Sequence, residues 1–197
     1  MRHIFLLGDS IRMGHDGKPG YERFLRQKSA GRWAIHSPGE NCQFAQYALR
    51  HVHQWAEHCP APAIELVIFN CGLWDVLRMF GDDPLTPPEV YTLMLTRLNR
   101  RLRLLFPQAK LLFLTSTPTL EDLYTGPCLR KNADIRQYNA LAQAVMERDG
   151  VPVLDLYTVA SCFPESWWDD HVHFTAEGAQ ALAETICTAA EAVLDPK

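Results

Sequence analysis

The chain has 197 residues, of which 47% are hydrophobic and 21% are charged, and its formal net charge is -4 at pH 7. A chain of this length and apolar content can bury one sizeable core, so we expect a single domain over residues 1–197. The acidic balance and the scattered lysines and arginines argue against nucleic acid as a partner, and no apolar run approaches the roughly 18 residues that membrane insertion needs.

The N-terminus and the cysteines indicate the cellular compartment. Residues 4–7 form the apolar run that precedes Gly8, and this run is too short for a signal peptide. The six cysteines are spread along the chain without the close spacing of metal-binding pairs, so we interpret them as free thiols. We therefore expect a cytoplasmic protein. The sequence gives no prediction of its oligomeric state.

Apolar runs that alternate with helical stripes predict a sheet with helices between its strands. In chain order, we expect strands at residues 3–7 and 32–37, a helix at 44–55, a strand at 65–70, a helix at 91–105, a strand at 110–116, a helix at 135–145, a strand at 151–156 and a closing helix at 175–193. Strands that are apolar throughout indicate a parallel sheet covered on both faces, because parallel strands need long connections. The predicted fold class is therefore α/β, a doubly wound sandwich with a five-stranded parallel sheet.

Polar and glycine-containing segments stand where these strands end. Residues 8–10 follow the first strand, residues 37–41 follow the second, residues 70–75 follow the third, and residues 167–178 lie beyond the fifth. In open α/β sheets, ligands bind beyond the carboxyl ends of the strands. We therefore expect the four segments to meet at one edge of the sheet, although they are far apart in the sequence.

Ser10, His173 and Asp170 in these segments supply the groups that a serine needs for acyl transfer. A hydroxyl is a weak nucleophile until an imidazole takes its proton, and a carboxylate fixes the imidazole tautomer and stabilises its charged form. Asp170 precedes His173 by three residues, so one loop can hold both. We expect the first helix to begin after Ser10, where backbone N–H groups can face a developing oxyanion.

Four short motifs together resemble those of the SGNH hydrolases, also called the GDSL esterase and lipase superfamily. GDSI at residues 8–11 is similar to the nucleophile block, Gly39 to the glycine block, GLWD at residues 72–75 to the third block, and residues 170–173 to the D-x-x-H block. The resemblance covers nearly the whole chain. It implies a flavodoxin-like three-layer α/β/α sandwich, a triad of Ser10, His173 and Asp170, and hydrolysis of small-molecule esters or thioesters without a cofactor.

The third block departs from the family pattern at one position. The family usually has G-x-N-D here, with an asparagine that donates to the oxyanion, and Trp74 occupies that position in this chain. The variant NCGLWD resembles a branch related to the PC-esterases. We therefore expect an oxyanion hole formed by the backbone N–H groups of Ser10 and Gly39 and the side chain of Asn70, with Trp74 as the alternative third donor.

Other interpretations of the same residues stay open at this point. His171 and His173 form an H-x-H pair beside two aspartates, which is an alternative metal site, although we expect no metal. Gly39 can supply a positive φ before the next helix, and Asn41 can cap that helix.

The resemblance favours an esterase that acts on short-chain or O-acetyl esters of a carbohydrate-like substrate. A lysophospholipase or acyl-thioesterase is the alternative enzyme, and a non-catalytic binding module on the same fold is the alternative without turnover. A redox or nucleotide-binding domain is disfavoured, because no G-x-G-x-x-G or P-loop motif follows a strand.

Overall fold

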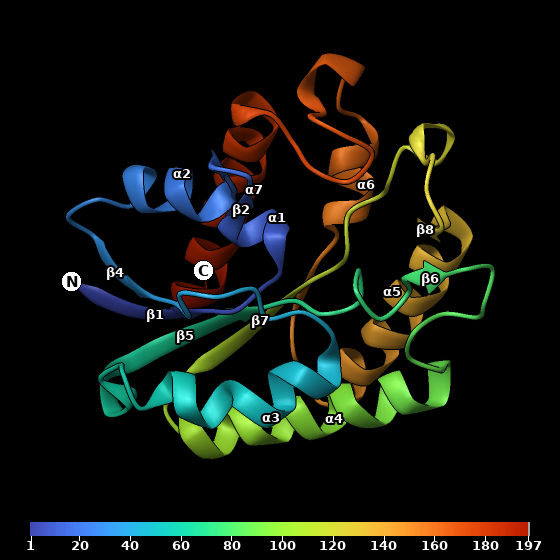
Figure 1. Cartoon of the computed structure of the whole chain (residues 1–197). Helices are drawn as coiled ribbons and strands as arrows, with labels where there is room; N and C mark the ends of the chain where they lie inside the picture. The colour runs from blue at the N-terminus through green and yellow to red at the C-terminus, as the bar shows by residue number, and fades with distance from the viewer. Residues whose placement is uncertain (197) are drawn as a thin grey trace.

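A five-stranded parallel sheet runs through the centre of the structure, a computed structural model that describes residues 1–196 (Figure 1). The strands are β1 (Arg2–Leu6), β4 (Trp33–His36), β5 (Ile64–Phe69), β7 (Lys110–Leu114) and β9 (Val153–Leu154). Their order across the sheet is β4-β1-β5-β7-β9, and each neighbouring pair is parallel. This is the flavodoxin-like order, with its switch point between β1 and β5. The prediction of an α/β fold with a five-stranded parallel sheet is confirmed.

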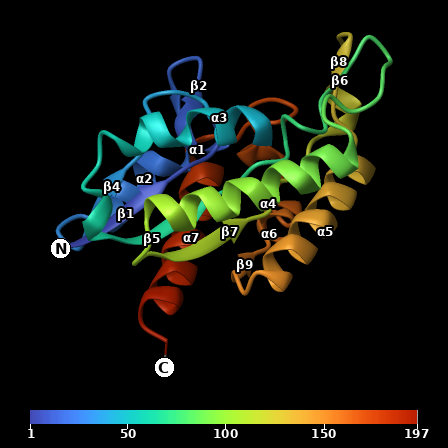
Figure 2. The same cartoon turned by 90° about the horizontal axis from the view of Figure 1, so that it is seen from below.

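Helices cover both faces of this sheet, as Figure 1 shows. One face carries α1 (Ser10–Met13), α2 (Tyr21–Lys28), α6 (Leu156–Ser161) and α7 (Ala176–Leu194). The other face carries α3 (Ala45–Ala56), α4 (Pro88–Leu105) and α5 (Asn132–Arg148), and Figure 2 shows α4 lying across it. Because both faces are covered, every residue of the central strand β5 except Glu65 is buried.

The helices predicted from periodicity correspond to α3, α4, α5 and α7, whereas α2 and α6 were not predicted. α2 is only eight residues long, so its buried residues Tyr21 and Leu25 give an apolar pattern too short to repeat over several turns. Three short helices of the 3₁₀ type and two antiparallel ribbons were also not predicted. They are Ala61–Ala63, Glu121–Leu123 and Glu165–Trp167, then β2 (Gly14–His15) with β3 (Lys18–Pro19), and β6 (Arg78–Met79) with β8 (Cys128–Leu129).

The start of α3 differs from the prediction. Asn41 does not cap this helix, because its Oδ1 accepts instead from the backbone N–H of Gln43, at 2.8 Å. The carboxylate of the buried Asp75 caps α3 from another loop, with its two oxygens 3.1 and 3.3 Å from the backbone nitrogen of Ala45. Burial raises the pKa of Asp75 to about 6. In this loop the residue with a left-handed φ is Gln43, at 50°, and not Gly39 as predicted.

The segments that follow β1, β4 and β5 are in contact. Cys42, beyond β4, donates its backbone N–H to the carbonyl of Gly8 at 3.1 Å, and a Cβ atom added to Gly8 would lie 2.5 Å from Oδ1 of Asn70, directly after β5. The segments that follow the first three predicted strands therefore meet at one edge of the sheet. Within residues 1–196, no helix has the length and apolar character needed to cross a membrane.

Candidate active site

Ser10, His173 and Asp170 lie in one hydrogen-bonded row. His173 Nε2 is 2.9 Å from Ser10 Oγ, and His173 Nδ1 is 2.7 Å from Asp170 Oδ2. Ser10 is the first residue of α1, which follows β1, and the other two residues lie in the loop before α7. The structure thus brings together three residues that were singled out from two distant segments. Their order matches a nucleophile, a base and the carboxylate that orients the base.

The Asp170 carboxylate is held by its own loop. Its Oδ1 accepts from the backbone N–H groups of Val172 and His173, at 2.6 and 2.7 Å, while its Oδ2 faces the His173 ring. Burial by itself raises the pKa of Asp170, but the hydrogen bonds from the ring and backbone of His173 and from Val172 outweigh burial and lower the pKa below its ordinary value. Asp170 is therefore a carboxylate that stays ionised and keeps the imidazole in one orientation.

Asp9 shapes the turn that presents Ser10. Its side chain accepts from the backbone N–H of Ile11 at 2.9 Å, and its carbonyl accepts from the backbone N–H groups of Arg12 and Met13, each at 3.1 Å. Burial raises the pKa of Asp9. The N–H of Ser10 has no hydrogen-bond acceptor in the described part of the chain, so it is the free donor at the start of α1.

Two more candidate donors lie in the neighbouring loops. The N–H of Gly39 makes no hydrogen bond to residues 1–196. Asn70 is nearly buried directly after β5, and a Cβ atom added to Gly8 would lie only 2.5 Å from Asn70 Oδ1, so the amide packs against the nucleophile turn. Trp74 instead lies beneath the guanidinium of Arg130, with 5.7 Å between the guanidinium carbon and the ring centroid.

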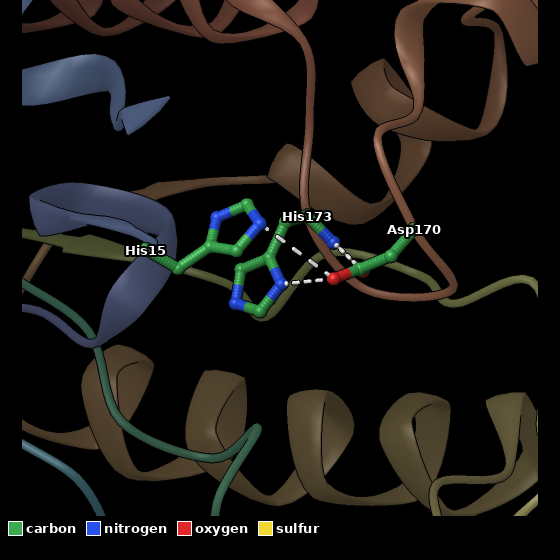
Figure 3. Close-up of side chains that lie close together, drawn as sticks. All are labelled: His15, Asp170 and His173. Atoms are coloured by element: carbon green, nitrogen blue, oxygen red, sulfur yellow. Dashed lines mark hydrogen bonds and ion pairs between the residues drawn. The ribbon is translucent and has the colours of Figure 1, made fainter. Parts of the chain in front are cut away.

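His15 is a site residue that the sequence analysis missed. Its ring stacks on His173, with the ring centroids 3.7 Å apart and the planes 16° apart (Figure 3). His15 Nε2 lies 2.9 Å from Asp169 Oδ2, and Lys18 Nζ donates to both oxygens of Asp169, at 2.6 and 2.7 Å. The β2/β3 ribbon that follows α1 is thereby fixed to the loop that carries the imidazole. No motif marks His15, and the one available signal was its position five residues after Ser10.

The geometry of the imidazole rings bears on the alternative of a metal site. His15, Asp170 and His173 each offer one nitrogen or oxygen atom, and these three atoms lie within 4.8 Å of one another. Among residues 1–196, His171 belongs to no such cluster. His171 packs on Tyr124, with their ring centroids 4.0 Å apart, so the H-x-H pair does not converge. A metal ion lies in the plane of an imidazole that binds it, and two nearly parallel stacked rings do not share such a point. The arrangement favours stacking over shared coordination.

Comparisons with known proteins agree on one family and one fold. A model of the GDSL-like lipase/acylhydrolase family matches residues 6–181. Among curated proteins, no sequence matches the chain. The crystal structure of a lipase/acylhydrolase from Enterococcus faecalis has a TM-score of 0.78 at 19% identity, covering 100% of this chain and 99% of that chain.

Two further solved structures are similar over almost their full lengths. Est24, a carbohydrate acetylesterase from Sinorhizobium meliloti, has a TM-score of 0.72 at 18% identity, covering 98% of this chain and 99% of that chain. An acetyl xylan esterase has a TM-score of 0.72 at 15% identity, covering 95% of this chain and 98% of that chain. At such identities the likeness concerns the fold.

Proposed function

Because the chain belongs to the GDSL-like lipase/acylhydrolase family, a family of carboxylic ester hydrolases, we propose that it cleaves esters through an acyl-enzyme formed on Ser10. The observation that carries this proposal is the continuous row of hydrogen bonds from Ser10 Oγ through the His173 ring to Asp170. A serine in such a row loses its proton to the imidazole as it attacks, which an isolated surface hydroxyl cannot do.

The reaction proceeds in two halves. Ser10 Oγ attacks the acyl carbon while His173 Nε2 takes the hydroxyl proton, and the same nitrogen then protonates the departing alcohol. Asp170 holds the proton-bearing Nδ1 of His173 and stabilises the imidazolium. In the second half, water attacks the acyl-enzyme, His173 takes a proton from the water, and Ser10 is released with its proton restored.

The oxyanion of each tetrahedral intermediate is assigned three donors in this proposal. The first is the N–H of Ser10, and the second is the N–H of Gly39, since both are free of other acceptors in the part of the chain that the structure describes. The third is the Asn70 amide, because it packs against Gly8, two residues before the nucleophile. The cation–π contact of Trp74 with Arg130 gives its ring another partner and favours Asn70 over Trp74.

We propose O-acetyl or other short-chain esters of a carbohydrate-like alcohol as substrates. Charged and hydrogen-bonding side chains surround the catalytic imidazole on the side of the β2/β3 ribbon, where His15, Asp169 and Lys18 form one network. Such surroundings suit a polar alcohol better than a long alkyl chain. Two of the similar structures are a carbohydrate acetylesterase and an acetyl xylan esterase, which supports the same substrate class.

A series of p-nitrophenyl esters from acetyl to dodecanoyl tests this function, together with an acetylated xylo-oligosaccharide and an acyl thioester. We expect the acetyl ester to have the highest kcat/KM in the series, and the oligosaccharide to release acetate. A rate that climbs with chain length would favour a lysophospholipase, and preference for the thioester would favour an acyl-thioesterase. A folded protein that turns over none of these substrates would be a binding module.

The third oxyanion donor gives a separate prediction. Asn70→Ala should lower kcat by about 10²- to 10³-fold with little change in KM, because a donor to the oxyanion acts only in the transition state. Trp74→Phe, which removes the indole N–H and keeps an aromatic ring, should retain most of kcat. Both variants are assayed on the acetyl ester after their folding is checked by circular dichroism. The reverse result would make Trp74 the donor, and full activity in both would leave only the two backbone donors.

A further inference from the structure

Arg12 is a buried arginine two residues after the nucleophile. Only 1% of its surface is exposed, although arginine is almost never fully buried unless its charge is paired. Its counterion is Glu22 on α2, which pairs with Arg12 Nη1. Burial raises the pKa of Glu22, but the attraction of Arg12 and hydrogen bonds from Ser37 and Arg26 outweigh burial and lower it. The pair is therefore ionised inside the protein.

The other nitrogens of Arg12 donate to backbone carbonyls of two different loops. Nε donates to the carbonyl of Gly8 at 3.1 Å, and Nη2 donates to the carbonyls of Glu40 and Pro38, at 2.6 and 3.2 Å. Gly8 belongs to the nucleophile turn, while Pro38 and Glu40 stand on either side of Gly39. One guanidinium thus connects the two segments that carry the proposed backbone donors.

Because of peptide geometry, contacts to the carbonyls fix the directions of the N–H groups of Gly39 and Ser10. A trans peptide unit is planar, and its C=O and N–H point in opposite directions. The carbonyl of Pro38 shares a peptide unit with the N–H of Gly39, so the bond from Arg12 Nη2 to that carbonyl turns the N–H away from the guanidinium. Similarly, the carbonyl of Asp9 shares a unit with the N–H of Ser10, and the main-chain N–H of Arg12 donates to that carbonyl at 3.1 Å.

We propose that Arg12 is a positioning residue that fixes the N–H groups of Ser10 and Gly39 relative to each other as the oxyanion hole. This inference rests on the function proposed above. The Arg12 side chain acts through the Pro38–Gly39 peptide unit and through the carbonyl of Gly8 in the turn that carries Ser10, and its charge is neutralised by Glu22. The main-chain bond to the Asp9 carbonyl is independent of the side chain. The planar fork of a guanidinium is needed to hold carbonyls of two loops at once, and the compact ammonium of a lysine does not reproduce it.

Arg12→Lys tests the inference, since lysine keeps a positive charge for Glu22 but loses the fork. We expect kcat per active site, counted by titration with a phosphonate that labels Ser10, to fall by about 10²- to 10³-fold, with KM changed by less than about threefold. The affinity for a boronic acid, which forms a tetrahedral adduct on serine, should fall in parallel. If Arg12→Lys only reduced the amount of folded protein, kcat per titrated site and the boronate affinity would be unchanged. That result would overturn the inference.

Arg26→Lys is the matched control. Arg26 also pairs with Glu22, through its Nη2 at 2.6 Å, and donates to the carbonyl of Ile35 at 2.6 Å and to Ser37 Oγ at 3.0 Å. It donates to none of the carbonyls that Arg12 holds in the nucleophile turn and beside Gly39. We expect kcat to stay within about threefold of wild type. An equal loss in both variants would assign the effect to the ion pair with Glu22 and would contradict the proposed role of Arg12.

A measurement on the wild-type protein covers the case in which Arg12→Lys does not fold. Binding of the boronic acid should shift the backbone amide proton signals of Ser10 and Gly39 downfield in NMR spectra, because both donate to the adduct oxygen. An unmoved Gly39 signal would overturn the inference. Wild type without activity on any ester would refute the proposed function itself, which is a different result from an active wild type whose Arg12→Lys variant keeps its kcat.

Discussion

Replacing Ser10 by alanine is expected to lower kcat on an acetyl ester by about 10⁴- to 10⁶-fold, because the acyl-enzyme can no longer form. Ser10 Oγ is the atom that faces His173 Nε2, at 2.9 Å. The wild type should also react with a fluorophosphonate, and intact mass followed by peptide mapping should place a single adduct on Ser10. The activated hydroxyl reacts much faster than a surface serine.

Ser161→Ala is the control for this experiment. Ser161 is exposed, and its hydroxyl donates to the carbonyl of Tyr157 at 2.7 Å and makes no hydrogen bond to an imidazole within residues 1–196. We expect this variant to keep its activity and its labelling. Labelling that persists in Ser10→Ala would show that another residue is the nucleophile.

Asp170→Asn is expected to lower kcat by about 10⁴-fold, because an amide does not stabilise the imidazolium and can hold the wrong tautomer of His173. The adjacent Asp169→Asn makes the same chemical change one residue earlier. Asp169 accepts from Lys18 and faces His15, and it makes no hydrogen bond to the His173 ring. We expect it to lower kcat by less than about tenfold. Equal losses in the two variants would contradict the assignment of Asp170 as the orienting carboxylate.

The same substitution should change how stability depends on pH. The pKa of Asp170 in the folded protein lies below its ordinary value of 3.8, so the folded state favours the ionised form. Its contribution to the free energy of unfolding is therefore fully present above about pH 4 and is lost as the pH falls through the lower pKa of the folded state. Urea unfolding of wild type and Asp170→Asn, from neutral to acidic pH, should show a difference that shrinks in acid. A difference in the free energy of unfolding that grows in acid would mean that folding raises the pKa of Asp170 and does not lower it.

The sheet could be predicted from the sequence because its strands are buried on both faces. A strand such as β5 is then apolar almost throughout, and this pattern is visible without knowledge of its neighbours. The cap of α3 could not be predicted, because the acceptor is Asp75, 30 residues from Ala45. A local search for a capping side chain selects Asn41 instead.

The residues of the candidate site also differ in whether the sequence alone could predict them. Asp170 and His173 are three residues apart, and the hydrogen bonds within their loop follow from that spacing, so a short motif identifies them. His15 and Arg12 have no such signal. The contacts of His15 lie with Asp169 and His173, and those of Arg12 lie with Glu22, Pro38 and Glu40, which only the tertiary fold brings close.

The wide separation of Ser10 and His173 along the chain has a consequence for biosynthesis. The two residues are 163 positions apart, so the proposed nucleophile is made long before its proposed base. At about 5–20 residues per second, a ribosome takes on the order of 10 s to cover that distance. During this time the nascent Ser10 lacks the His173 imidazole that is proposed to take its proton. The pair proposed for catalysis therefore forms only after His173 has been synthesised, and α7, which follows it, packs beside α2.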